Sequence, residues 1–172
     1  AEFSPYTEQD AAKATADGLD CVAFQFSANA GEPLKPLSKV ISGGEMSRLM
    51  LAIKTQADGG EVETYLFDEI DAGISGKTAR TVAEKFAAIA RRKQIVAVSH
   101  LAQIAAMADR NFLIRKLVEE GKTHTDIVKQ DKEAKREELV RLLGGSDGAA
   151  AHTLADELIA AAEDYKRTLR GE

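Results

Sequence analysis

The chain has 172 residues, the usual size of one domain, and 44% of them are hydrophobic, which is typical of a folded globular protein. Its 23 basic and 28 acidic residues give a net charge of −5, which disfavours a protein that coats nucleic acid by bulk charge but leaves room for a local basic patch. The single cysteine, Cys21, excludes a disulfide within the chain, and without a long apolar run or a signal-peptide pattern we expect a cytoplasmic protein with no membrane partner.

The beginning of the chain predicts little regular structure. Residues 1–19 are polar and rich in alanine, and we expect them to be a leader or the end of a longer element that precedes one domain at 20–172. Apolar and aromatic residues alternate over 20–27, which predicts a strand because neighbouring strand residues face opposite sides. Residues 35–41 are predicted to be a loop.

A strand–helix–strand pattern occupies the middle of the chain. Residues 64–67 and 94–98 are short, continuously apolar segments, as buried parallel strands are, and 77–91 between them has helical periodicity. This pattern predicts two parallel strands with a right-handed connection. An amphipathic helix is predicted before it, at 45–56. The apolar stripe of that helix comprises Met46, Leu49, Met50 and Ile53.

The last part of the chain predicts helices around a hairpin. A short helix is expected at 101–108, a β-hairpin from 112–118 and 123–129, and two helices at 132–143 and 149–169. The apolar face of the last helix comprises Leu154, Leu158 and Ile159. The whole pattern predicts an α/β fold in which a mainly parallel sheet is flanked by helices and followed by a β-hairpin and C-terminal helices.

Chemically useful side chains follow both predicted parallel strands. Asp68 and Glu69 end the first strand, and Ser99 and His100 end the second. Adjacent parallel strands place these ends on one edge, where ligands of open α/β sheets bind. A carboxylate such as Asp68 can hold Mg²⁺, and its neighbour Glu69 can polarise an attacking water. A solvated strand end is the structural alternative.

A glycine-rich turn opens the helix at 45–56. In Ser42-Gly43-Gly44-Glu45 the glycines expose backbone N–H groups, and the helix dipole adds partial positive charge, so the turn is suited to a phosphate. Ser42 can cap the helix or donate to a phosphate oxygen. An ordinary helix cap with a glycine turn is the equal alternative.

Two other patterns have structural interpretations. Gly76-Lys77-Thr78 looks like the end of a P-loop, but Asp71 stands where the first glycine of that motif belongs, and no other P-loop exists in the sequence. The basic run 91–93 is interpreted as a helix C-terminus that stabilises the helix dipole, with contact to DNA phosphate as the less favoured alternative.

Four motifs follow one another at Ile41–Glu45, Leu66–Glu69, Asp71 and His100. In this order the chain resembles the C-terminal half of a P-loop ABC-type ATPase head, with its signature motif, Walker B motif, D-loop and switch histidine. The signature motif ends in Glu45, where transporters have glutamine, and in this it resembles the motif of the SMC-like ATPases. The resemblance is greatest to the RecN family of bacterial DNA-repair ATPases. The segments that carry it are 31–37, 42–51, 67–76, 99–109 and 141–145.

The resemblance implies roles for individual residues. Asp68 would coordinate Mg²⁺, Glu69 would be the general base for water attack on the γ-phosphate, and His100 would contact that phosphate. Asp71 would bridge two heads. The signature residues would close over the γ-phosphate of ATP held by a second head; these are Ser42, Gly43, Gly44 and Glu45.

The resemblance also implies ligands and partners. ATP and Mg²⁺ would be the cofactors, and a P-loop-bearing N-terminal lobe of the same protein would complete the head. Residues 1–19 would follow the returning helix of a coiled-coil arm. A second head would join in an ATP-dependent homodimer, and the full-length protein would act on DNA in double-strand break repair at the nucleoid. The chain alone would lack ATPase activity.

Two alternatives remain open at this point. The chain could be a non-catalytic protein-interaction module, in which the acidic strand end and the glycine turn are structural. It could also be a fragment of an ABC transporter nucleotide-binding domain, although Glu45 and the long match through Ala108 count against that interpretation.

Overall fold

The computed structural model describes residues 16, 18, 24–27, 31, 33–37, 43–56, 62–119, 122–144 and 148–171. The contacts divide the chain into two compact units, Ala1–Ile41 and Ser42–Glu172. The domain boundary that the sequence predicts after residue 19 falls outside the described residues and stays a prediction.

The first unit contains one short antiparallel pair of strands. β1 (Gln25–Phe26) pairs with β2 (Lys35–Pro36), and the Leu37 N–H donates to the Phe24 carbonyl at 3.0 Å. The strand predicted at 20–27 is therefore found in its second half, and residues 20–23 lie outside the description. The predicted loop at 35–41 is wrong at its first two residues, because Pro36 is tolerated on an edge strand that needs no N–H there.

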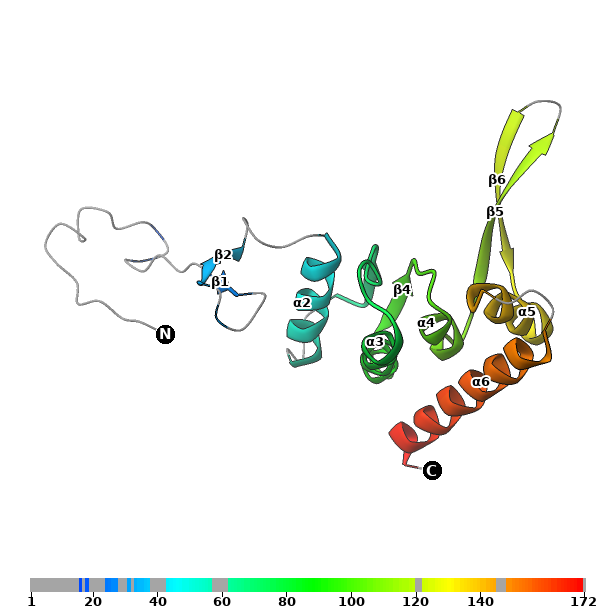
Figure 1. Ribbon diagram of the computed structural model, residues 1–172. Coiled ribbons are helices and arrows are strands. Elements are labelled where there is room, and N and C mark those ends of the chain that lie inside the picture. The colour runs from blue at the N-terminus through cyan, green and yellow to red at the C-terminus, as the bar shows by residue number, and fades with distance from the viewer. Residues whose placement is uncertain are drawn as a thin grey trace, which may run out of the picture. The chain divides into compact units, whose positions relative to one another are not determined.

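The second unit contains the predicted βαβ arrangement (Figure 1). β3 (Thr64–Phe67) and β4 (Gln94–Ala97) are parallel and in register, with α3 (Gly76–Ala90) between them in the chain. The pairing continues by one residue, since the Val98 N–H donates to the Phe67 carbonyl at 3.0 Å. The two strand ends are therefore adjacent, as the pattern predicts.

Helices surround the apolar core of this unit. The rings of Phe67 and Phe86 lie 5.0 Å apart between β3 and α3, and Ile70 is completely buried beside them. α4 (Ala102–Met107) packs on α3 and contributes Ile104 and Met107. The other fully packed members of the core include Leu51, Val82, Ala83, Ala102, Ala106, Leu139, Val140, Ala155 and Ala162.

The remaining elements are a hairpin and two helices. β5 (Phe112–Glu119) and β6 (Lys122–Lys129) pair antiparallel along their whole length and extend as a two-stranded ribbon (Figure 1). α5 (Lys132–Leu142) and α6 (Ala149–Arg170) pack on each other and on α4. These elements confirm the predicted hairpin and C-terminal helices. In the part of the chain that is described, no helix is long and apolar enough to cross a membrane.

A lysine ties α5 to the end of α4. Lys135 Nζ donates to the carbonyls of Ala106 at 2.9 Å and Ala108 at 2.8 Å, carbonyl groups at the C-terminal end of α4. Burial, and then the nearby charge of Lys166, lower the pKa of Lys135 to about 8. The lysine thus satisfies backbone oxygens that would otherwise be unpaired at this helix end.

The α/β class is confirmed, but the sheet arrangement differs from the prediction. The described strands form three separate two-stranded sheets, and only β3–β4 is parallel. A mainly parallel sheet is therefore not found among the described residues. The hairpin strands pair with each other alone, so they add no strand to the parallel pair.

Several apolar side chains expected in the core are exposed. The buried residues of α2 (Gly43–Gln56) are Gly44 and Leu51. Three members of the apolar stripe that the sequence predicts for this helix are exposed instead: Met46, Met50 and Ile53. On α6 the buried residues are Ala155 and Ala162, and Leu154 is exposed. Exposed apolar side chains on the strands, or directly after β4 in the case of Val98, include Leu66, Val96, Val98, Phe112, Ile114, Val118 and Ile127.

Candidate functional site

The ends of β3 and β4 are joined by a buried carboxylate. Asp71 is only 4% exposed, and its Oδ2 accepts from Ser99 Oγ at 2.6 Å and from the His100 backbone N–H at 2.7 Å. The same oxygen lies 3.0 Å from His100 Nδ1. The parallel pairing of the strands therefore brings three of the predicted polar residues together, and Asp71 holds the backbone and the ring of His100 in place.

His100 remains open to solvent in spite of these contacts. Its side chain is 73% exposed, and the nitrogen that faces Asp71 is Nδ1. Because Nδ1 is engaged by a carboxylate, Nε2 is the ring nitrogen available to an outside ligand. Asp71 thus orients the ring of His100, and the other side of the ring remains accessible to a ligand from solvent.

Asp68 and Glu69 project from the exposed end of β3. The Glu69 N–H donates to Asp68 Oδ1 at 2.9 Å, which fixes one carboxylate oxygen of Asp68. Glu69 has a φ of 54°, and it is the one non-glycine residue with positive φ in the described part of the chain. Such a conformation costs about 1–3 kcal/mol and is concentrated at functional sites, so its presence at a predicted catalytic residue is informative.

The N-terminus of α2 lies against this acidic loop. A Cβ on Gly43 would lie 2.7 Å from Glu69 Oε2, and a Cβ on Gly44 would lie 2.9 Å from both Ala72 Cβ and the Glu69 carbonyl oxygen. Gly43 is exposed, whereas Gly44 is buried. Glycine at position 44 therefore permits the close approach of helix and loop. Glu45 follows in the first turn, and Ser42 lies outside the described residues.

Two further side chains, which sequence reasoning did not single out, clamp α2 to the same loop. Ser47 Oγ donates to the Asp68 carbonyl at 3.1 Å, and Arg48 donates to the carbonyls of Ile70 at 3.3 Å and Ala72 at 2.8 Å. Helical spacing could have identified both residues from the sequence, because positions 47 and 48 lie one turn after Gly43 and Gly44 and on the same face of the helix. The loop 68–72 is consequently held from α2 on one side and from the β4 end on the other.

The donor chemistry of this loop fits Mg²⁺ held mainly by a substrate. No group of three His, Cys, Asp or Glu side chains suited to a metal occurs in the described part of the chain. Asp68 nevertheless offers an exposed carboxylate at a strand end, and Mg²⁺ is commonly bound by one or two carboxylates together with phosphate oxygens and water. Asp68 is therefore the residue that could hold the ion.

Comparison with known proteins identifies relatives of almost the whole chain. It is 40% identical over 171 residues to the DNA repair protein RecN of Bacillus subtilis (strain 168), an alignment of 97% of this chain and 29% of that protein. It is 46% identical over 154 residues to RecN of Treponema pallidum (strain Nichols), covering 87% of this chain and 26% of that protein. It is 41% identical over 165 residues to RecN of Vibrio cholerae serotype O1, covering 94% of this chain and 30% of that protein. The chain thus spans about three tenths of the length of these relatives.

The other comparisons add little. No family model matches the chain. A solved structure described as "Structural biochemistry of ATP-driven dimerization and DNA stimulated activation of SMC ATPases" is 20% identical, with a TM-score of 0.46, and covers 69% of this chain and 71% of that one. A likeness of this size does not establish a common fold.

Proposed function

We propose that this chain, a relative of the RecN DNA repair proteins over most of its length, forms the C-terminal lobe of an SMC-like ATPase head. Its sequence contains no P-loop, so another part of the same protein would supply the phosphate cradle. The completed head would hydrolyse ATP during double-strand break repair on DNA, in the cytoplasm at the nucleoid. The similarity to RecN favours this function over a transporter fragment.

The observation that carries the proposal is the placement of Glu69. Its carboxylate lies at an exposed strand end, on a residue with left-handed backbone, and faces the N-terminus of α2. A carboxylate held in this way can accept the proton of a water that attacks the γ-phosphate, while the Pγ–O bond to the leaving ADP breaks. The strain at Glu69 is maintained because the loop is clamped on both sides.

The neighbouring residues have complementary roles in this proposal. Mg²⁺, when bound with the nucleotide, would neutralise developing charge on the phosphates, and Asp68 is the carboxylate that would hold it. Asp71 orients His100, whose free Nε2 would contact the γ-phosphate. The bridging role between heads that the resemblance implies for Asp71 stays a prediction, and in this chain the carboxylate is buried.

A second head would complete each nucleotide site. Gly43 at the start of α2 is exposed at a positive helix end, and the Glu69 carboxylate of the same chain lies beside it, so this side chain would move aside when the helix end receives a phosphate of ATP bound by another head. In the proposed homodimer, Ser42, Gly43, Gly44 and Glu45 of one head would close over the γ-phosphate on the other. Hydrolysis would remove that contact, and the heads would separate.

The test compares the isolated chain with the full-length parent protein. Purified alone, the chain should show no Mg-ATP turnover, because it has no phosphate cradle. In the parent, Glu69→Gln should lower kcat by a factor of about 10²–10⁴ through loss of the base, while ATP-bound dimers accumulate in light-scattering measurements.

Glu63→Gln is the matched control, since Glu63 is exposed and lies beyond the opposite end of β3. It should leave kcat and dimerisation unchanged. A Glu69→Gln parent that stays monomeric with ATP would contradict the two-head arrangement. A parent that neither binds nor hydrolyses ATP would instead favour the non-catalytic interaction module.

A further inference from the structure

The backbone on both sides of Glu69 is fixed by hydrogen bonds within the loop 68–72. Before it, the Glu69 N–H donates to Asp68 Oδ1 at 2.9 Å. After it, the Glu69 carbonyl accepts from the Ala72 N–H at 3.0 Å, which closes a tight turn over residues 69–72. The strained backbone of Glu69, with its φ of 54°, lies between these two peptide groups. A shift of either peptide group therefore redirects the Glu69 side chain.

One side chain of α2 holds the part of this turn that follows Glu69. Arg48 Nη1 donates to the Ile70 carbonyl at 3.3 Å and to the Ala72 carbonyl at 2.8 Å. A single guanidinium nitrogen thus joins two alternate carbonyls of the turn. Hydrogen bonds from a charged donor are about twice as strong as those between neutral groups. Arg48 consequently fixes the peptide groups on which the closing hydrogen bond of the turn depends.

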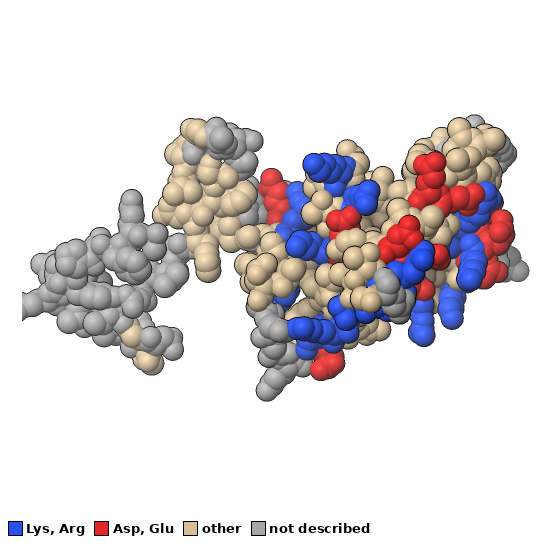
Figure 2. Space-filling model, turned by 90° about the horizontal axis from the view of Figure 1, so that it is seen from below, with Lys and Arg blue, Asp and Glu red and all other residues tan. Residues whose placement is uncertain are grey.

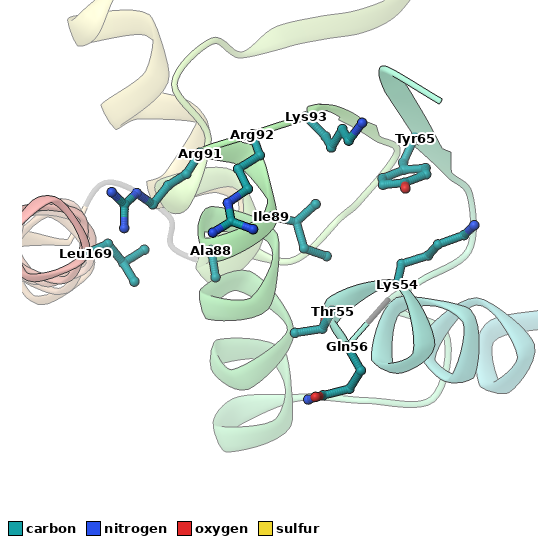
Figure 3. A pocket seen from close by; sticks show the side chains of 10 residues that line it. All are labelled: Lys54, Thr55, Gln56, Tyr65, Ala88, Ile89, Arg91, Arg92, Lys93 and Leu169. Carbon is teal, nitrogen blue, oxygen red and sulfur yellow. The ribbon is translucent and has the colours of Figure 1, made fainter. Parts of the chain in front are cut away.

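Helix α2 has anchors in the second unit other than this arginine. Leu51 is only 3% exposed and belongs to the apolar core. In the last turn of α2, Lys54 Nζ lies 5.4 Å from the centre of the Tyr65 ring on β3 (Figure 3). Because the helix is held at these other points, the hydrogen bonds of Arg48 constrain the exposed turn more than they constrain the helix.

Arg48 also differs from arginines in the surface ion pairs of this unit. On the face shown in Figure 2, Lys and Arg side chains are interleaved with Asp and Glu. Arg80, for example, is 65% exposed and pairs with Glu84 one turn further along α3. Such exposed ion pairs contribute little to stability. The two hydrogen bonds of Arg48 end instead on backbone carbonyls of a catalytic loop, so they specify a backbone conformation.

We propose that Arg48 is a positioning residue for ATP hydrolysis: by holding the turn after Glu69, it keeps the backbone of Glu69 in the conformation from which the carboxylate can reach the attacking water. This inference rests on the proposed function, in which Glu69 is the general base. A base must lie within hydrogen-bond distance of the proton that it accepts, and a misplacement of about 1 Å can lower a rate by about 10². The proton passes from water to Glu69, and Arg48 neither gives nor takes one.

The test compares variants of the full-length parent protein in steady-state ATPase assays. Arg48→Met keeps much of the side chain's length and volume but removes its donors, so kcat should fall at least about tenfold while the KM for ATP changes less than about twofold. ATP-bound dimers should accumulate in light-scattering measurements, as for Glu69→Gln, because binding is kept while hydrolysis slows. Arg48→Lys should restore kcat to about threefold below wild type, because one charged nitrogen makes both hydrogen bonds.

A double variant separates positioning from a merely structural role. In the Glu69→Gln parent, adding Arg48→Met should lower the residual kcat less than about twofold, since the base that the arginine positions is already lost. A structural role would instead lower kcat by the same factor in both backgrounds, and this result would overturn the proposal.

Arg80→Met is the matched control, because it removes an arginine from an exposed ion pair on α3 and should leave kcat and dimerisation unchanged. If Arg48→Met does not fold, Arg48→Gln takes its place with the same expectations. A parent that folds with neither substitution, or that loses dimers together with kcat, would show that the arginine maintains the fold and would contradict positioning. Wild-type kcat in Arg48→Met beside a low kcat in Glu69→Gln would refute the role of Arg48 alone. Wild-type kcat in Glu69→Gln would refute the proposed function itself.

Discussion

The most constrained residue of the candidate site is Asp71. One buried oxygen accepts from two donors and lies within reach of a third, and all three belong to Ser99 and His100 on the neighbouring strand end. Ser99 Oγ in turn accepts from the Leu101 N–H at 3.1 Å. Removal of a buried acceptor leaves its donors without partners, which costs more than the bond itself contributes. The strand ends therefore depend on this carboxylate.

We predict that Asp71→Ala lowers the free energy of unfolding by about 2–4 kcal/mol, because it leaves the Ser99 hydroxyl and the His100 N–H unsatisfied. Urea denaturation of the chain measures the loss. Asp126→Asn is the control, since it removes an exposed ion pair with Arg115 and should cost at most about 1 kcal/mol. Equal costs for the two substitutions would show that Asp71 does not join the strand ends.

At the scale of elements, the contact between α2 and the loop 68–72 depends on two adjacent glycines with different surroundings. The methyl group of Gly44→Ala would meet backbone oxygens and Ala72, which cannot move without shifting the loop. We predict a loss of about 1–3 kcal/mol in unfolding free energy for this variant, from overpacking.

Gly43→Ala is the matched substitution one residue earlier. Its methyl group would meet only the carboxylate of Glu69, the end of a flexible side chain. The unfolding free energy should change by less than about 0.5 kcal/mol, measured by the same denaturation experiment as for Gly44→Ala. A larger loss for Gly43→Ala than for Gly44→Ala would contradict this packing of α2 against the loop 68–72.

Local sequence patterns predicted most helices and strands, whereas the buried face of α2 and the burial of Asp71 depend on tertiary contacts that such patterns do not contain. The βαβ unit and the hairpin were predictable because apolar periodicity and turn residues act over a few positions. The face through which α2 packs could not be predicted in the same way. Met46 and Gly44 lie on different faces of the helix, and contact with the neighbouring loop 68–72 determines that the face with Gly44 is buried. The positions of Asp68 and His100 at adjacent strand ends followed from parallel pairing. The burial of Asp71 depended on a turn whose course the sequence does not reveal.

At the scale of the whole molecule, several apolar side chains of the second unit are exposed and are not covered by other described residues of that unit. Leu66 on β3 is 73% exposed, and Ile114 and Ile127 lie directly opposite each other on one face of the hairpin with most of their surface in solvent. Apolar side chains gathered on a face in this way usually mark an interface. We expect the P-loop-bearing lobe that is proposed to complete the head to bury these side chains in the full-length protein.

One pair of substitutions on the hairpin should affect the isolated chain and the full-length parent differently. In the isolated chain Ile114→Thr/Ile127→Thr should change the unfolding free energy by less than about 0.5 kcal/mol, because both residues are exposed and threonine keeps the β-branched shape. In the full-length parent the same double variant should lose about 2–4 kcal/mol, because the buried ethyl group of each isoleucine is replaced by a hydroxyl without a partner. Leu139→Ala, which empties a fully buried position, should cost about 2–5 kcal/mol in both proteins. A hairpin variant that destabilises the isolated chain as much as the parent would mean that this face packs within the chain and needs no second lobe.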